Sequence, residues 1–260
     1  MHAAGWRPPV GKGVCGGSCE TVTAERIGRR IARSGLCSRR TAERWIAAGR
    51  VHVNGEPVIL PGRNVVAEDT VTVDGNVLPA PARARLFRFH KPPGCVTTRA
   101  DPAGRRTVFD LLPDGLPYLH PVGRLDLASE GLLLLTTDGA LKRRLELPRT
   151  GLPRHYRVRV HGRIDPNRLA ALANGTQVEG VRYGPIAVEV ARGGRSNAWL
   201  EVTLHEGKNR EIRRVLQHVG LLVNRLIRTA YGPVELGSLP RGSLAEVPAA
   251  ELHEHFGCSR

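Results

Sequence analysis

Residues 120–139 read HPVGRLDLASEGLLLLTTDG, and this stretch decides how the whole chain is interpreted. The apolar run Leu132–Leu135 predicts a buried strand. Asp126 lies just before that run and just after the Gly123-Arg124 corner, so we expect it to be held rigidly. A carboxylate at the mouth of a buried strand suits a nucleophile or a charge stabiliser facing a cleft. The other motifs of the chain have to distinguish these roles.

The composition predicts a polyanionic partner. The chain has 260 residues, 41% of them apolar, which is enough for a small domain and a larger one. It carries 39 basic and 24 acidic side chains, a formal net charge of +15, and all but four of the basic residues are arginine. Surfaces this basic bind phosphate backbones, and arginine adds bidentate contacts and stacking. An arginine-rich genome would explain arginine over lysine but not the net charge. We therefore expect a nucleic acid partner.

The cysteines argue against a disulfide scaffold. They are odd in number and widely scattered, at Cys15, Cys19, Cys37, Cys95 and Cys258. This pattern favours a reducing compartment, and we expect a cytoplasmic protein. A metal at Cys15 and Cys19 would need further ligands, and the one candidate is His2, so no metal site is expected.

No targeting or membrane segment is predicted. The first 20 residues are not continuously apolar, which excludes a secretory signal of the usual kind. We interpret residues 1–22 as a disordered leader, or as the product of a start codon assigned too far upstream. The longest aliphatic run, Leu132–Leu135, is far too short to cross a bilayer.

Residues 23–74 predict a small unit of two helices and a sheet. Ile27 and Ile31 have helical spacing over 24–34, and Ser38 is placed to cap a second helix that runs to about Ala48. Period-two alternation then surrounds Asn54-Gly55, a strong hairpin signal, and Asp74-Gly75 suits a second turn.

The two helices of this unit predict a basic face. Between Glu25 and Arg50 there are eight arginines and two acids. A solvated charge run is the ordinary interpretation of such a segment, but here acids are too scarce to offset the repulsion locally. We expect an RNA-binding face formed by Arg29, Arg30, Arg33, Ser38, Arg39, Arg40 and Arg44.

A second, larger domain is predicted over residues 85–248, after a proline- and alanine-rich linker at 75–84 and before a tail at 249–260. Strand-like runs alternate with a few helices, which is typical of an α+β domain with a mixed, mostly antiparallel central sheet. The expected strands are 86–90, 131–135, 155–160, 186–190 and 198–204, and the expected helices are 139–146, 165–174 and 208–219.

Four strings of this domain carry candidate chemistry. They are HKPPG at 90–94 with TVFDLLP at 107–113, the opening stretch at 120–139, RHYRV at 154–158, and LHEGKNREIRRV at 204–215. An enzyme that acts on one base of a folded RNA must turn that base out of the stack and hold it. Tyr156 offers a flat wall and a hydroxyl that can exchange a proton. An ionised Asp126 can attack the ribose or the base, or stabilise charge there. As isolated residues, Tyr156 fits equally well as a core aromatic and Asp126 as an ordinary surface carboxylate.

Taken in order, these strings resemble a known enzyme family. Residues 24–70, with ERI at 25–27, SGLCSRR at 34–40 and AGRV at 48–51, resemble an S4 RNA-binding domain. Residues 24 to about 247 resemble the RsuA/RluB-type pseudouridine synthases, which carry an N-terminal S4 domain. This resemblance implies a cofactor-free enzyme, acting as a monomer, that isomerises uridine to pseudouridine in rRNA or a pre-ribosomal particle.

The resemblance also implies the site. Its catalytic residues would be Asp126, Tyr156 and Arg213, with the Arg213 guanidinium keeping Asp126 ionised. Arg124 is closer in sequence, but we expect it to contact an RNA phosphate. The expected RNA contacts of the catalytic domain are Lys91, Arg124, Lys208, Asn209, Arg210 and Arg214.

Some positions depart from the family pattern. Ala128-Ser129, Thr137 and Arg154 differ from the residues common among the relatives, which affects substrate contacts more than activity. Residues 98–110 resemble the RluB-like branch, so 23S rRNA is the favoured substrate, although the sequence does not identify the uridine. Two alternatives stay open: a non-catalytic ribosome-assembly protein that keeps the fold, and an RNA glycosidase using a second carboxylate, for which Asp138 is the nearest candidate.

Overall fold

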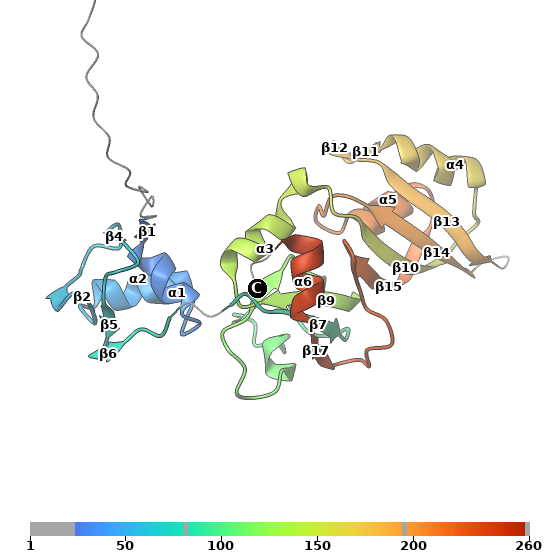
Figure 1. Ribbon diagram of the computed structural model, residues 1–260. Helices are drawn as coiled ribbons and strands as arrows, with labels where there is room; N and C mark the ends of the chain where they lie inside the picture. Colours follow the sequence, from blue (N-terminus) through green and yellow to red (C-terminus); the bar gives the residue numbers. More distant parts are fainter. Residues whose placement is uncertain (1–23, 81–82, 194–196, 258–260) are drawn as a thin grey trace, which may run out of the picture.

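A computed structural model of the chain describes residues 24–80, 83–193 and 197–257. Two folded units are seen, one at the N-terminal end and a larger one that contains the long sheet (Figure 1). The expectations for residues 1–22, including those for Cys15 and Cys19, lie outside the described residues. Within the described part, no helix is long and apolar enough to cross a membrane.

The N-terminal unit has the two helices and the hairpins that the sequence predicts. Ser38 caps the second helix, its hydroxyl accepting a hydrogen bond from the Thr41 N–H at 3.0 Å. Asn54 and Gly55 both have positive φ, the backbone that a tight hairpin turn requires. The helices are α1 (Ile27–Arg33) and α2 (Arg39–Ala47), and the strands are β1 (Glu25–Arg26), β2 (Val51–Val53), β3 (Glu56–Pro57), β4 (Asn64–Val65), β5 (Val71–Val73) and β6 (Asn76–Val77).

The larger unit is built on a nine-stranded sheet of order β13-β14-β10-β15-β9-β7-β17, with β8 paired to β9 and β16 to β15. All of these pairs are antiparallel except β15 with β9, so the prediction of a mixed, mostly antiparallel sheet is confirmed. The strands are β7 (Leu86–Lys91), β8 (His120–Val122), β9 (Glu130–Thr136), β10 (Arg154–His161), β13 (Ile186–Gly193), β14 (Asn197–Leu204), β15 (Leu222–Tyr231), β16 (Val234–Glu235) and β17 (Leu244–Glu246).

Helices and short turns complete this unit. The helix predicted for 139–146 has those bounds, whereas the one predicted from 208 begins three residues later because 208–210 form a turn. Residues 249–256, expected to belong to a tail, form a helix whose Leu252 is buried. The helices are α3 (Gly139–Glu146), α4 (Pro166–Ala171), α5 (Glu211–His218) and α6 (Ala249–Phe256), with three-residue 3₁₀ turns at Phe109–Leu111, Pro148–Thr150 and Leu172–Asn174 and a hairpin of β11 (Thr176–Val178) and β12 (Val181–Tyr183).

The run Leu132–Leu135 is continuously apolar because β9 is covered on both faces. Leu133 and Leu135 pack into a cluster that also holds Ile212 and Val215 of α5. Leu132 and Leu134 pack into a second cluster with side chains of α3 and α6, which lie together over that face (Figure 1). Since successive strand residues point to opposite faces, both halves of the run are buried.

Strand β15 is the longest element that the sequence pattern does not predict. It lies between β10 and β9 and joins the two halves of the sheet. Its parallel contact with β9 is close, because an added Cβ on Gly131 would lie 2.3 Å from the Arg228 carbonyl oxygen. Gly131 has a φ of 104°, which side chains rarely adopt. The glycine after Glu130 therefore lets β9 approach β15 just beyond the loop that carries Asp126.

Candidate active site

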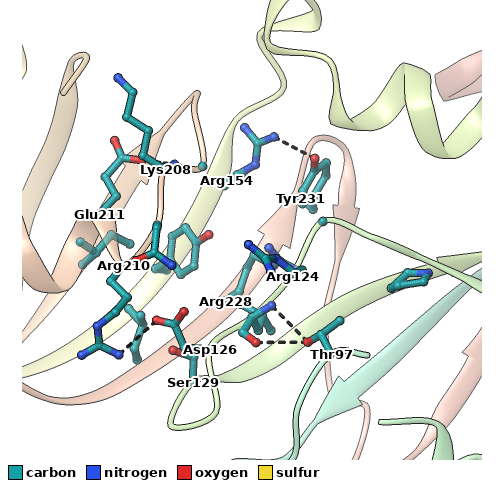
Figure 2. A pocket seen from close by; sticks show the side chains of 18 of the residues that line it. Thr97, Arg124, Asp126, Ser129, Arg154, Lys208, Arg210, Glu211, Arg228 and Tyr231 are labelled. Carbon is teal, nitrogen blue, oxygen red and sulfur yellow. Dashed lines mark hydrogen bonds and ion pairs between the residues drawn. The ribbon is translucent and has the colours of Figure 1, made fainter. Parts of the chain in front are cut away.

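A cleft of about 960 Å³ opens beside the β9–β15 junction. It is lined by Asp126, by Tyr156 of β10, by Arg228 and Tyr231 of β15, and by the turn at 205–211 (Figure 2). The sequence places these groups far apart, and the insertion of β15 between β9 and β10 brings them to one cavity. Asp126 and Tyr156, predicted to share a site, do line the same cleft.

The loop Asp126–Ser129 is held by its backbone carbonyls. Lys91, which is fully buried, donates from Nζ to the carbonyl oxygens of Asp126 at 3.1 Å and Ser129 at 2.8 Å. The Gly94 N–H donates to Leu127 O at 2.8 Å, and Arg213 Nη2 donates to Ala128 O at 3.2 Å. All four consecutive carbonyls thus accept hydrogen bonds from the body of the domain.

Burial of Lys91 corrects its predicted role. A side chain with no exposed surface cannot contact RNA, so Lys91 acts inside the fold rather than at the interface. Burial lowers its pKa from the usual value, while the nearby Cys95 and Asp126 oppose that shift. Three carbonyl acceptors, the third being Pro92 O at 3.0 Å, compensate the buried ammonium group.

The backbone before Asp126 is fixed as well. Gly123 has a φ of 66°, and its N–H donates to Glu146 Oε1 at the end of α3 at 2.6 Å. The Thr97 hydroxyl donates to Leu125 O at 3.1 Å and accepts from the Leu125 N–H at 3.3 Å, as the dashed lines at Thr97 in Figure 2 show. The carboxylate is therefore displayed on a rigid turn.

The cation beside Asp126 is Arg210. Its Nη1 lies 3.7 Å from Asp126 Oδ2 (Figure 2). Arg213, predicted for this position, instead donates to Val223 O at 3.0 Å and to the carbonyl of Ala128. The reason is local: Arg210 has a φ of 51°, a left-handed conformation that turns the chain just before α5, and Arg213 follows in the first turn of the helix.

Arg213 still acts on the site through the loop. It is half-buried, and burial followed by repulsion from Arg210 lowers its pKa, whereas Asp126 raises it. The Arg213 guanidinium therefore interacts electrostatically with the Asp126 carboxylate, while its hydrogen bonds go to the backbone carbonyls of Val223 and Ala128. Its hydrogen bonds link α5 to the Asp126 loop and to β15, and a catalytic role for Arg213 stays a prediction.

Tyr156 and its neighbours form the wall opposite the loop. Tyr156 is 7% exposed and packs in the same apolar cluster as Ile212. It is paired across the strands with Arg228, so both side chains lie on the same face of the sheet. Arg228 is buried, donates from Nε to Leu132 O at 2.7 Å, and has an Nη2 atom with no hydrogen-bond partner in the described structure.

Sequence reasoning missed three residues of this wall. Arg154 donates from Nη2 to the Tyr231 hydroxyl at 2.8 Å (Figure 2) and from Nη1 to His205 O at 2.8 Å. Tyr231 in turn donates to Leu145 O at 2.9 Å. Arg228 and Tyr231 lie on β15, where the buried positions Leu226, Arg228 and Ala230 alternate with less buried ones. The two apolar members of this series, Leu226 and Ala230, were the available signal.

The turn at 205–211 is supported by two glutamates. Buried Glu211 accepts a hydrogen bond at Oε2 from the Lys208 N–H at 2.9 Å. Burial, and secondarily Glu206, raises the pKa of Glu211 to about 7. Glu206 accepts from Gly184 N–H at 2.6 Å and pairs with Lys208 Nζ at 2.7 Å, and although burial opposes it, these contacts lower its pKa. Lys208, Asn209 and Arg210 line the cleft, while Arg214 is half-buried on α5 outside the lining. The RNA contacts predicted for these four residues stay predictions.

The predicted basic face of the N-terminal unit is organised by one acid. Glu25 of β1 lies 3.6 Å from Arg29, 3.6 Å from Arg30 and 3.1 Å from Arg33, so three guanidinium groups converge on it. On α2, Arg39 pairs with Glu43 at 3.1 Å, and Arg40 and Arg44 are exposed. Ser38 uses its hydroxyl as a helix cap. RNA contact by this face stays a prediction.

Asp138, the candidate second carboxylate, lies at the start of α3. Asp138 caps α3, accepting from the Leu141 N–H at 2.6 Å, and does not line the cleft. No group of three histidine, cysteine, aspartate or glutamate side chains in the described segments is placed to hold a metal ion.

Comparisons with known proteins agree with this geometry. A family model for RNA pseudouridylate synthase matches residues 85–218, and an S4 domain model matches residues 25–71. The chain is 45% identical to a protein of Rickettsia bellii described as an uncharacterized RNA pseudouridine synthase, over 86% of this chain and 96% of that one. It is 42% identical to ribosomal large subunit pseudouridine synthase B of Salmonella typhimurium, over 88% of this chain and 81% of that one.

A solved structure shows the same architecture. The crystal structure of a pseudouridylate synthase superposes with a TM-score of 0.64 at 27% identity, over 89% of this chain and 99% of that one. The family model covers the cleft from Asp126 to the turn at 205–211 and the helix that follows. On these matches and on this site, the chain belongs to the RNA pseudouridylate synthase family and is a pseudouridine synthase with an N-terminal S4 domain.

Proposed function

We propose that this enzyme isomerises a uridine of large-subunit rRNA to pseudouridine without a cofactor. The observation that carries the proposal is the Asp126 carboxylate, 28% exposed in a basic cleft and held on a loop whose four carbonyls are all engaged. The similarity to ribosomal large subunit pseudouridine synthase B supports 23S rRNA as the substrate.

The reaction exchanges one glycosidic bond for another. The target uridine turns out of its stack into the cleft. Asp126 then attacks C1′, attacks C6 of the base, or stabilises charge that develops at C1′, and the bond from C1′ to N1 of uracil breaks. The released uracil rotates and C5 bonds to C1′. A bond that Asp126 has formed to C1′ is displaced in this step, and one formed to C6 breaks by elimination, so the carboxylate is returned. The proton on C5 leaves while N1 gains one, so atoms and charge balance.

The surrounding residues have separate roles in this proposal. Tyr156 forms the wall against which the base packs, and its hydroxyl can relay the C5 proton, accepting it while passing its own proton to solvent. The Arg210 guanidinium lies beside the Asp126 carboxylate and offsets its negative charge. Arg213 and Lys91 position the Asp126 loop through its carbonyls. Arg124, exposed on the rim of the cleft, contacts a phosphate of the RNA.

The S4 domain sets the register of the RNA. Its arginines contact phosphates beside the target, a positioning role that carries no sequence information itself. The enzyme would act as a monomer in the cytoplasm on free rRNA or a pre-ribosomal particle. A glycosidase is disfavoured because its candidate second carboxylate, Asp138, is used as a helix cap.

Asp126→Asn tests the proposal. We expect release of tritium from RNA labelled at C5 of uridine to be abolished, while RNA binding stays within a few-fold of wild type. Asp138→Asn is the matched control, since asparagine caps helices as well as aspartate does and activity should be kept. Pseudouridine mapping in rRNA from cells with and without the gene identifies the position. Full activity of Asp126→Asn would exclude the mechanism.

A further inference from the structure

Leu127 is a large apolar side chain kept in water beside the Asp126 carboxylate. It follows Asp126 directly, lines the cleft and is 42% exposed. Leu125, on the other side of Asp126, is 7% exposed and packs in the larger apolar cluster. Of the two leucines that flank Asp126, only Leu127 is therefore exposed.

The backbone prevents Leu127 from retracting. Its own carbonyl accepts from Gly94 N–H at 2.8 Å, and the carbonyls on either side accept from Lys91 and Arg213. The Ser129 N–H also donates to Asp126 O at 3.0 Å, closing a tight turn around Leu127. Turning this side chain toward the core would break several of these hydrogen bonds at once. The fold thus keeps the apolar surface of Leu127 in water, which is unfavourable in free energy.

The surroundings of Leu127 identify the ligand. Arg124, Lys208 and Arg210 line the same cleft, so a phosphate backbone is expected on this side of the domain. An apolar group among cations contributes little to phosphate binding, but it can contact base faces. Proteins that open base stacks insert leucine and similar side chains between neighbouring bases.

We propose that Leu127 is a wedge that enters the base stack beside the target uridine. It occupies the space that the base vacates on turning into the cleft toward Asp126. The inference rests on the proposed function. Stacked between bases, the exposed surface of Leu127 leaves the water, which favours the turned-out state over the stacked one. Because Leu127 and Asp126 are adjacent on one rigid turn, entry of the wedge also brings the carboxylate to the base.

The test uses the shortest rRNA fragment in which wild type forms pseudouridine, with 2-aminopurine beside the target uridine. A second fragment replaces both neighbours of the target with abasic sites, so that no stack has to be opened. Single-turnover rates and the 2-aminopurine fluorescence rise are compared for wild type, Leu127→Ala and Leu127→Met. Leu222→Ala, 59% exposed on β15 and outside the cleft lining, is the control.

We expect Leu127→Ala to lose about 3- to 10-fold in rate on the stacked fragment, from the apolar surface it no longer buries. Its fluorescence rise should fall with the rate, and its rate on the abasic-flanked fragment should equal that of wild type. Leu127→Met and Leu222→Ala should behave as wild type on both. A variant whose Asp126 turn is merely distorted would be slow on both fragments. A wild-type rate on the abasic-flanked fragment therefore distinguishes loss of the wedge from such a distortion.

Three results would overturn the wedge while leaving the proposed function intact. They are an equal loss on both fragments, no loss on either, and a rescue pattern shown by Arg124→Ala and not by Leu127→Ala. In each of these cases wild type still forms pseudouridine and Asp126→Asn does not. A wild-type enzyme that forms no pseudouridine in any rRNA fragment would overturn both proposals.

Discussion

Gly131→Ala should unfold the catalytic domain at a much lower denaturant concentration. The added Cβ would lie 2.3 Å from Arg228 O and 2.6 Å from Arg228 N, both of them backbone atoms that cannot step aside. A non-glycine residue at a strongly positive φ costs about 1–3 kcal/mol, and overpacking of this kind costs a further ~1–3 kcal/mol. Their sum is roughly 4 kcal/mol, a large share of the stability of a typical domain.

The control is Gly139→Ala at the first position of α3. An added Cβ there meets nothing within 4 Å, and alanine is the better helix former, so stability should be unchanged or raised by up to about 1 kcal/mol. Urea unfolding is followed by the fluorescence of Trp199 on β14. Trp6 and Trp45, the other two tryptophans of the chain, are replaced by phenylalanine so that the signal comes from the catalytic domain. A free energy of unfolding for Gly131→Ala within about 1 kcal/mol of the wild-type value would refute the close approach of β9 and β15.

Two further perturbations probe the supports of the site. Lys91→Met removes a donor that three carbonyls share; Asp126 O keeps the Ser129 N–H and Pro92 O keeps the Cys95 thiol, whereas Ser129 O loses its donor. We expect a loss of about 1–3 kcal/mol in stability and of about 100-fold in kcat, with RNA binding kept; unchanged kcat in a folded variant would contradict its role in positioning Asp126. Glu211 has a pKa raised from its ordinary value of 4.5 to about 7, so between these pH values the folded protein holds a proton that the unfolded chain has released. Stability therefore falls as the pH rises from about 4.5 to about 7 and is level above that. Glu211→Gln should be more stable than wild type at pH 8, by on the order of 1–3 kcal/mol, and nearly equal to it at about pH 4, as thermal unfolding at both pH values will show; a difference independent of pH would exclude this proton.

Local signals predicted most of the fold. The cap at Ser38, the turns at Asn54-Gly55 and Asp74-Gly75, and the apolar run of β9 all depend on neighbouring residues, and all are present. Strand β15 was not predicted, because Asn224, Arg225 and Arg228 interrupt its alternation. Those arginines are tolerated since Arg225 pairs with buried Glu130 and Arg228 reaches a carbonyl of β9, contacts that only the assembled sheet provides.

The sequence predicted which residues lie at the site better than it predicted the contacts that they make. Asp126 and Tyr156 reach one cleft, as the motifs indicate. Arg210, rather than Arg213, lies beside Asp126 because the backbone at Arg210 is left-handed. Arginine rarely adopts this conformation, so the residue type did not predict it. The burial of Lys91 is equally hidden in sequence, because lysine is almost always exposed unless paired.

The place of β15 in the sheet also bears on when the enzyme becomes active during its own synthesis. Among the described strands, β9 and β10 are joined only through β15, which is made after both. Chains fold from the N-terminus as they leave the ribosome, so the S4 domain can already grip RNA while the two halves of the catalytic sheet are still separate. Asp126 and Tyr156 are brought together by β15, which ends at residue 231, so we expect a nascent chain to bind RNA before it is able to modify it.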